Sequence, residues 1–294
     1  MRLLYHMLHY WRGARCLKIE DFPGAILHFS KVIQLNPRNY YAYHNRGVAL
    51  QGMGSYASSI ADFGLALKLK PNAQTFGARG VSRKLLGDFD GAFDDQTRAL
   101  ALDPRVAAAH GELAFLHHVK GDSDRAIVES TTAIGLAPKD PIIQRGRGYI
   151  QFCRGRFDAA AADMERSLAL EFDPYAVLFL YLSLARLSGR ARPDLAAVAS
   201  RWTAAQWPGP VFDLLMEHST AQQVLNATAT APEQAEAYFY IGEWHLLNGR
   251  HDEAARALEI ALRSLPPWFN EYSAARSELA TLAETVAAAS RCLS

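Results

Sequence analysis

The chain has 294 residues, half of them hydrophobic, and its mean hydropathy is close to zero. These values indicate a soluble protein that is long enough to bury a substantial core. Thirty-one Lys and Arg oppose thirty Asp and Glu, which leaves a formal charge of +1. This balance gives no electrostatic reason to expect nucleic acid, because phosphate binding requires a basic face. A local basic patch is one interpretation of Arg145, Arg147, Arg154 and Arg156, and an ordinary solvated helix face is the other.

Neither the cysteines nor the N-terminal residues suggest a special compartment. Cys16, Cys153 and Cys292 are odd in number and widely spaced, so they predict no disulfide framework and no zinc site. No apolar segment reaches the roughly 18 residues of a membrane-spanning helix. The apolar start is interrupted by His6 and His9 and lacks the features of an export signal. Read as given, the chain would be cytoplasmic, but the sequence does not decide the compartment.

Small residues recur along the chain at a nearly fixed spacing. Successive members of the first series are 34, 33, 34 and 34 residues apart: Gly13, Gly47, Gly80, Ala114 and Gly148. A second series and a set of prolines follow the same interval: Gly54, Gly87, Gly121, Gly155 and Gly189, with Pro37, Pro71, Pro104 and Pro138. Such a period is typical of a solenoid, in which each unit buries its apolar face by stacking on its neighbours.

Each period predicts two helices with one buried stripe apiece. Between residues 40 and 72 the first helix carries Tyr43 and Gly47, and the second carries Phe63. These residues belong to sets spaced by three and four. Gly54 is predicted to end the first helix. Where the helices cross, small residues such as Gly47 and Ala92 are expected to let the backbones approach, so that a large side chain there would overpack the site.

The repeat spacing divides the chain into three regions. Residues 1–174 are predicted to hold five units, namely 6–39, 40–72, 73–106, 107–140 and 141–174. Residues 175–234 contain a degenerate repeat plus a helical insertion, in which Asp194 stands where a buried alanine belongs. Residues 235–294 contain a last unit and a long helix, from about residue 270, that is expected to cap the end of the stack.

The repeated pattern resembles the tetratricopeptide repeat (TPR) family. The quoted marks are YHNRGVALQGMGSYASSIADFGLALKLKP in the second unit and YFYIGEWHLLNGRHDEAARALEIALRSLP in the last. Gln96 and Ser130 depart from the pattern, since an aromatic residue is commoner there. The resemblance implies an all-α fold, a TPR α-solenoid that is a right-handed superhelix of antiparallel helix pairs, with C-terminal capping helices.

The irregular joints resemble a narrower group, the NlpI-type bacterial lipoproteins. The motifs are YLSLARL, the W-P-G-P-V corner, A-Y-F-Y-I-G-E-W-H-L-L-x-G and F-N-E-Y-x-x-A-x-x-E-L. The resemblance implies a dimeric adaptor, anchored to the membrane in the periplasm, that docks proteases and cell-wall hydrolases. Cys16 lies within a repeat helix without an apolar lead, so we do not expect it to carry a lipid. A periplasmic, membrane-anchored location would follow if the N-terminus were incomplete.

No motif for chemistry occurs. His6 with His9, and His117 or His118, lack a third ligand at suitable spacing, and there is no H-E-x-x-H. There is also no G-x-S-x-G and no Gly-rich phosphate loop. The sequence therefore predicts no metal, no cofactor and no enzymatic activity.

The first helix of each pair is expected to line a concave groove that binds proteins or peptides. The predicted groove residues are Tyr41, His44, Gln51, Gln74, Lys84, Phe115, His118, Arg145, Tyr149 and Phe152. Interleaved aromatic and polar groups on a preformed trough suit an extended peptide or a short helix. The alternative is that Phe115, Tyr149 and Phe152 pack beneath the C-terminal insertion.

Two functions follow from these features. The first is a non-enzymatic scaffold that docks partner proteins in the groove, and the resemblance implies envelope proteases or cell-wall hydrolases as those partners. The second is a structural subunit that self-assembles within an envelope complex. In that case the apolar N-terminal helix would form the interface of a homodimer, since a solenoid end needs a polar cap or a partner. Its apolar residues are Leu3, Leu4, Leu8 and Trp11.

Overall fold

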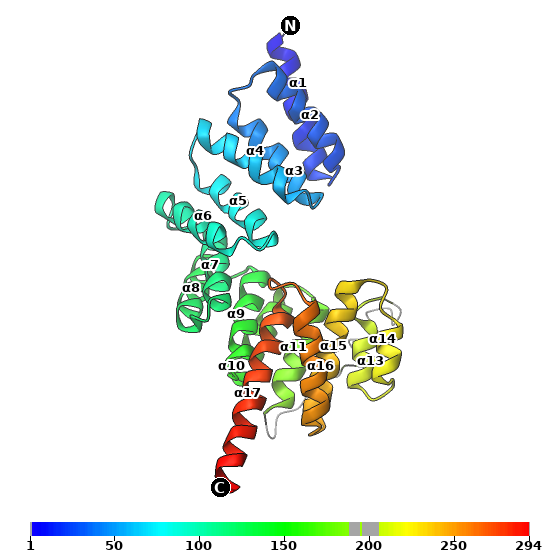
Figure 1. The fold of residues 1–294 in the computed structure, drawn as a ribbon. Coiled ribbons are helices and arrows are strands. Elements are labelled where there is room, and N and C mark those ends of the chain that lie inside the picture. The colour runs from blue at the N-terminus through cyan, green and yellow to red at the C-terminus, as the bar shows by residue number, and fades with distance from the viewer. Residues whose placement is uncertain (1, 188–194, 196–205, 294) are drawn as a thin grey trace. The chain divides into compact units, whose positions relative to one another are not determined.

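The computed structural model describes residues 2–187, 195 and 206–293. These residues form sixteen helices and no strand (Figure 1), which confirms the all-α prediction. Two residues of the predicted repeat pattern, Gly189 and Asp194, lie outside the described residues. Within the ranges described, no helix combines the length and apolar character that crossing a membrane requires.

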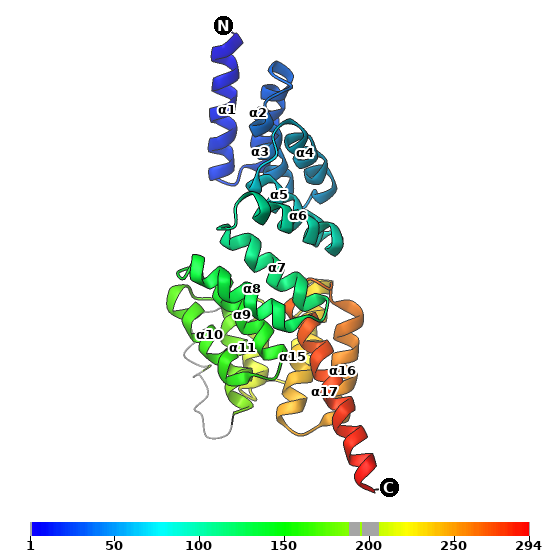
Figure 2. The same ribbon diagram turned by 90° about the vertical axis from the view of Figure 1, so that its left-hand side faces the viewer.

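The chain divides into two compact units, Met1–Leu116 (unit 1) and His117–Ser294 (unit 2). The boundary falls within the predicted repeat 107–140. Unit 1 contains α1 (Arg2–Lys18), α2 (Phe22–Leu35), α3 (Tyr40–Gly52), α4 (Tyr56–Leu69), α5 (Ala73–Leu85), α6 (Phe89–Leu102) and most of α7 (Ala107–Val119). In this unit α1 packs on α2, α3 on α4 and α5 on α6, and α2 and α4 also pack on the first helix of the next pair (Figure 2).

Within each pair, a small residue on the first helix meets the residue sixteen positions later. A Cβ added to Gly47 would lie 2.7 Å from the Phe63 ring, and one added to Gly148 would lie 2.8 Å from Met164. The same close approach joins Gly13 to Phe29, Gly80 to Gln96 and Gly242 to Leu258. Such distances are too short for a real Cβ, so a larger residue at these positions would force the facing side chain to move, most severely at the rigid rings of Phe29 and Phe63.

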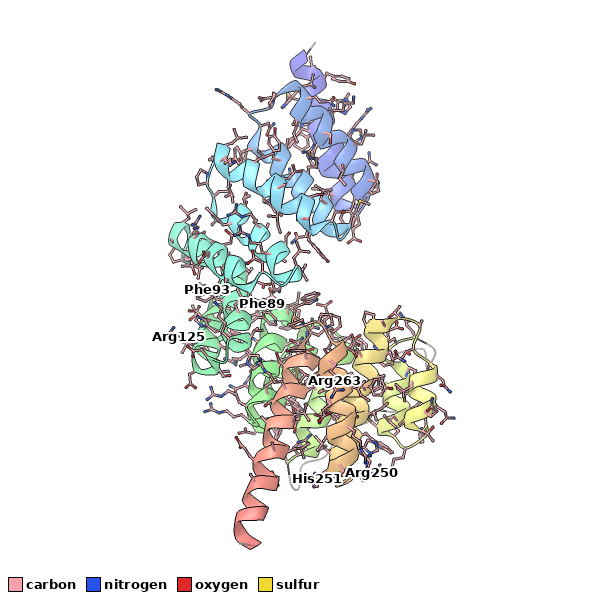
Figure 3. All side chains as sticks on the ribbon, viewed as in Figure 1. Phe89, Phe93, Arg125, Arg250, His251 and Arg263 are labelled. Atoms are coloured by element: carbon pink, nitrogen blue, oxygen red, sulfur yellow. The ribbon has the colours of Figure 1, made fainter. Side chains whose placement is uncertain are left out.

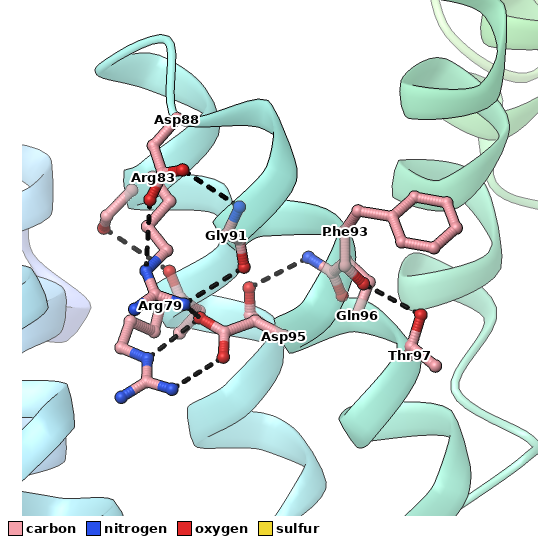
Figure 4. A network of polar contacts seen from close by, with 11 residues as sticks. Arg79, Arg83, Asp88, Gly91, Phe93, Asp95, Gln96 and Thr97 are labelled. Atoms are coloured by element: carbon pink, nitrogen blue, oxygen red, sulfur yellow. Dashed lines mark hydrogen bonds and ion pairs between the residues drawn. The ribbon is translucent and has the colours of Figure 1, made fainter. Parts of the chain in front are cut away.

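One residue earlier, the same spacing carries an ion pair. The guanidinium of Arg46 binds both carboxylate oxygens of Asp62, at 2.6 and 2.8 Å. Equivalent two-point pairs join Arg79 to Asp95 and Arg147 to Asp163. In unit 1 the Asp95 carboxylate also accepts from Arg83, which reaches the Gly91 carbonyl oxygen (Figure 4).

Two of these arginines also tie one helix pair to the pair before it. Arg46 donates from Nη1 to Ser30 on α2, at 3.0 Å. Arg147 donates from Nη1 to Thr131 on the preceding second helix, at 3.2 Å. A two-point arginine–carboxylate pair has a fixed geometry, so these side chains set the register of neighbouring pairs as well as joining two helices.

The predicted helix-ending glycines lie in the left-handed region of backbone space. Gly54 has a φ of 71° and Gly87 a φ of 81°, values that side chains with a Cβ rarely adopt. At the equivalent turn of the first repeat, Glu20 adopts a φ of 58°. The turn geometry of the repeat is therefore kept where its glycine is missing.

Unit 2 continues the helix pairs and then departs from them. Its helices are α8 (Ser123–Leu136), α9 (Pro141–Cys153), α10 (Phe157–Leu170), α11 (Pro174–Ala185), α13 (Gly209–Leu215), α14 (Ala221–Asn226), α15 (Ala231–Leu247), α16 (His251–Ser264) and α17 (Asn270–Leu293). Every residue of α11 from Ala176 to Leu184 is buried, which makes this helix the centre of the largest core cluster.

The last helix, α17, does more than cap the end of the stack. It packs on α16, as an end cap would, and also on α9, the first helix of a much earlier pair. Ser277 donates to the carbonyl oxygen of Cys153, and Arg276 donates to that of Val119 at 3.5 Å. Besides lying on α16, α17 therefore covers the first-helix side of unit 2.

The helix phase can be tested with two alanine-to-leucine substitutions. Ala92 is buried and Ala57 is exposed, and both lie on second helices. Ala92→Leu is expected to cost about 1 to 3 kcal/mol by overpacking and to lower the melting temperature, whereas Ala57→Leu is expected to leave it nearly unchanged. Equal effects of the two substitutions in thermal melts would contradict this assignment of buried and exposed faces.

Candidate partner-binding surface

The predicted groove residues of unit 1 lie on its first helices and join those helices to one another. His44 Nδ1 lies 2.9 Å from Thr75 Oγ1, which connects α3 to α5. Gln51 donates to the carbonyl oxygen of Ala78 at 3.4 Å, and Lys84 pairs with Glu112 on α7 at 2.7 Å. We call this surface the first-helix face of unit 1. Its members are Tyr10, Tyr41, His44, Asn45, Gln51, Gln74, Thr75, Lys84 and Glu112.

Most of these side chains are held in place but only half buried. The Asn45 amide donates to the Tyr10 hydroxyl at 3.3 Å, so α1 is connected to α3 in the same manner. Burial lowers the pKa of His44, so its imidazole is neutral at pH 7 and offers one donor and one acceptor. The face therefore presents fixed polar groups in the order of the first helices.

Two residues of this face remain open to solvent. Tyr41 is 52% exposed, and its ring lies 3.9 Å from that of Tyr40. Gln74, at the start of α5, is also exposed. An exposed tyrosine beside fixed polar groups combines a large apolar surface with a hydroxyl that can hydrogen-bond, which is common where proteins bind partners.

Phe115 is packed within unit 1 and is half buried. The ammonium of Lys84 lies 5.0 Å from the centre of its ring. The ring of Phe89, at the start of α6 (Figure 3), is 6.5 Å away. Phe115 thus supports the position of Lys84 while keeping part of its own surface exposed.

The predicted groove residues of unit 2 are engaged by other side chains. Arg145 forms an ion pair with Asp173, the residue that precedes α11. His118 is buried, and its Nδ1 lies 3.4 Å from Ser123 Oγ. Burial, followed by the nearby charges of Arg276 and Arg154, lowers the pKa of His118 to about 4. His118 is therefore withdrawn from the surface, whereas Arg145 is ion-paired but partly exposed.

Tyr149 and Phe152 are core residues, so their prediction as groove residues is wrong for this structure. Phe152 is 1% exposed. Both rings meet Phe179 of α11 edge-on, with centroid distances of 4.6 Å from Tyr149 and 5.0 Å from Phe152. The two rings are buried, as the alternative expected, but the helix that meets them is α11, which precedes the C-terminal insertion. The signal in the sequence was α11 itself, because a helix that is apolar all round must be covered on all sides.

Four buried glutamates in unit 2 were not anticipated from the sequence. Glu236 and Glu243 are seven residues apart on α15, and Glu271 and Glu278 are seven apart on α17. A seven-residue spacing puts each pair on one face of its helix, which was the available signal. Within the described residues, no group of His, Cys, Asp and Glu suits a metal ion.

Each of these carboxylates has a hydrogen-bonding partner. Arg186 at the end of α11 donates to Glu243 at 2.6 Å and to Glu278 at 3.4 Å. Glu236 accepts from the Trp207 indole at 2.7 Å and from the Tyr175 hydroxyl at 3.1 Å. Glu271 accepts from Tyr240 at 3.0 Å. These bonds fasten α17 to α11 and α15, since a buried polar group is costly without its partner.

The burial of Phe152 predicts a stability effect. Phe152→Ala is expected to lower the free energy of unfolding by about 3 to 5 kcal/mol, the range for deleting a buried ring. Tyr41→Ala, at an exposed aromatic position, is the matched control and should have a small effect. A melting temperature that Phe152→Ala leaves unchanged would contradict the placement of this ring beneath α11.

The buried glutamates predict a pH dependence. Burial, and then the charge of Glu236, raises the pKa of Glu271 from its ordinary 4.5 to about 7. The folded state therefore binds this proton more tightly than the unfolded state. Its stabilising contribution is complete below about pH 4.5 and is lost as the pH rises through about 7.

Thermal melts between about pH 5 and pH 8 test this dependence. Stability should fall over the interval by up to about 3 kcal/mol for this group. Glu271→Gln keeps an acceptor for Tyr240 but does not titrate, so it should make the pH profile less steep, while the contribution of Glu243, whose pKa burial raises to about 8, remains. Glu259→Gln, in an exposed ion pair with Arg263, is the control and should leave the pH profile as steep as that of the wild type. Parallel profiles for wild type and Glu271→Gln would rule out the assignment.

The chain is similar to known proteins in its repeats and in its fold. The tetratricopeptide repeat family matches residues 40–72 and 219–267. The chain is 28% identical over 214 residues to the lipoprotein NlpI homolog of Haemophilus influenzae, covering 69% of this chain and 68% of the relative.

Two solved structures share the fold over almost the whole chain. A tetratricopeptide repeat protein from Parabacteroides merdae has a TM-score of 0.57 at 13% identity and covers 95% of this chain and 99% of its own. PilF of Pseudomonas aeruginosa has a TM-score of 0.54 at 12% identity and covers 94% and 99%. Proteins with this repeat and fold are generally non-enzymatic scaffolds that bind proteins or peptides. The chain therefore contains tetratricopeptide repeats, has the fold of tetratricopeptide repeat proteins and is similar to the NlpI homolog.

Proposed function

We propose that this protein is a non-enzymatic adaptor and that the first-helix face of unit 1 holds its partner. The observation that carries the proposal is the row of fixed polar contacts between successive first helices, at Asn45, His44, Gln51 and Lys84. The scaffold role that the relatives indicate supports the proposal.

The chemistry of the face favours an extended polypeptide segment. Such a segment offers backbone donors and acceptors along its length, which match hydrogen-bonding groups carried by successive first helices. Because neighbouring side chains already hold His44 and Gln51 in place, less conformational entropy is lost when a partner binds. Exposed Tyr41 would supply the aromatic anchor.

Unit 2 is proposed to contribute differently. Its predicted groove residues Tyr149 and Phe152 are buried, and α17 lies on α9. A partner could reach these side chains only by displacing packed helices. The proposal therefore places peptide binding on unit 1 and assigns α17 a structural role.

The resemblance to the NlpI homolog motivates a finer proposal. We propose partners among envelope proteases and cell-wall hydrolases, an envelope location and a homodimer. The second candidate function is a self-assembling subunit of an envelope complex. It is favoured by the exposed apolar residues of α1, among them Leu4, Leu8 and Trp11.

Site-specific photocrosslinking tests the docking face. A photoreactive phenylalanine analogue at Tyr41 or at Gln74 should capture partner proteins in a bacterial lysate, and mass spectrometry would identify them. The same analogue at Ala57 or Leu65, which are exposed on second helix α4, is the control and should capture much less.

Substitution of the two crosslinking positions provides the complementary test. Tyr41→Ala combined with Gln74→Ala should weaken recovery of the captured protein by about tenfold, the effect of losing roughly 1.4 kcal/mol, with an unchanged melting temperature. Equal capture at the α3, α5 and α4 positions, or undiminished recovery by the double variant, would remove this face from the proposal.

A further inference from the structure

Helix α1 carries an apolar stripe that nothing in unit 1 covers. Leu4, Met7, Leu8 and Trp11 are 77%, 51%, 44% and 67% exposed. Their spacing of three and four places them on one side of the helix. The opposite side carries buried His9 and Gly13 and packs on α2, with further contact to α3. Figure 2 shows α1 at one edge of unit 1, with its neighbours on one side only.

The same side of α1 becomes cationic toward its C-terminal end. Arg15 and Lys18 follow Trp11 at a spacing of four and three, and Arg12 lies beside them. All three are exposed. No Asp or Glu occurs between residues 2 and 19. Among the described residues, none of these three cations forms an ion pair with a carboxylate.

Arg12 occupies a repeat position whose arginine is ion-paired in other repeats, but the first repeat supplies no carboxylate partner for it. Arg12 stands 34 residues before Arg46, whose partner is Asp62. The corresponding partner position of Arg12 is His28, which lies 3.0 Å from His9. An arginine that is neutralised in three other repeats is therefore exposed without a carboxylate in the first.

We propose that α1 docks unit 1 on an anionic lipid surface. The apolar stripe would enter the boundary between headgroups and acyl chains, and Arg12, Arg15 and Lys18 would meet the lipid phosphates. An exposed row of Leu, Met and Trp with adjacent cations and no carboxylate is typical of helices that lie in a membrane interface. Trp11, between the apolar and cationic parts, would sit at the headgroup level, where its amphipathic ring is favoured.

Charge distinguishes this occupant from a second copy of the chain. A two-fold symmetric contact would bring identical α1 surfaces together. Within residues 2–19 each surface carries cations and no acid, so charge would oppose the contact that the apolar stripe alone would favour. Nucleic acid would match the charge but would leave the four apolar side chains in water. An anionic bilayer satisfies both halves of the helix.

Vesicle co-sedimentation with the full chain tests the proposal. The protein should bind vesicles that mix phosphatidylcholine with phosphatidylglycerol, and bind vesicles of phosphatidylcholine alone far more weakly. Binding should decrease as salt is raised. Arg12→Ala and Arg15→Ala should each weaken binding by roughly fivefold, which corresponds to about 1 kcal/mol per cation. Leu4→Ser combined with Trp11→Ser should abolish it.

Matched variants separate this stripe from general surface effects. Leu69→Ser with Leu102→Ser removes exposed apolar residues of unit 1 that lie on second helices, and Arg125→Ala removes an exposed cation (Figure 3). Both should bind vesicles as wild type does. Circular dichroism of each variant should retain the wild-type helix content and melting temperature, since the replaced side chains are exposed.

Three results would overturn the proposal. The first is the absence of binding to anionic vesicles. The second is binding that survives Leu4→Ser with Trp11→Ser. The third is a dimer in light scattering that those substitutions convert to a monomer without any vesicle binding by the wild type, which would assign the stripe to a second copy.

Discussion

The contact between residues sixteen positions apart is what the rest of the structure depends on. In five helix pairs it brings a glycine on the first helix against a larger residue on the second, as with Gly47 and Phe63. One residue earlier the same spacing places Arg46 against Asp62. Steric fit and ion pair thus fix the same crossing. Because the ion pair is largely buried, losing one partner would leave an uncompensated charge, which is costly.

The first-helix side of the repeated helix pair is half exposed in unit 1 and covered in unit 2. In unit 1, polar side chains such as His44 and Lys84 reach the next first helix and stay half exposed. In unit 2, the all-apolar α11 covers Tyr149 and Phe152, and α17 packs on α9. A repeat thus remains a potential docking surface only where no later helix in the chain needs its first-helix side for burial.

The sequence predicts the contacts that recur and misses those that occur once. Helix pairs, helix-ending glycines such as Gly54 and the need for small residues at Gly47 all follow from a period of about 34 residues. The ties of α17 join residues far apart in the chain, 92 positions for Arg186 with Glu278 and 124 for Ser277 with Cys153. A periodic sequence pattern cannot predict a contact that occurs only once. The groove prediction therefore failed at Phe152, where a non-repeating helix supplies the cover.

A double-mutant cycle on Gly47 and Phe63 tests the sixteen-residue contact most directly. The fourth repeat has Ala114 and Ser130 at these positions, a larger first residue with a smaller second one. Gly47→Ala should destabilise the wild type, because an overpacking cost of about 1 to 3 kcal/mol exceeds the gain in helix propensity of about 1 kcal/mol. In the Phe63→Ser background the same substitution should be neutral or stabilising. Equal effects of Gly47→Ala in the two backgrounds would show that the residues do not share one space, and would contradict the account.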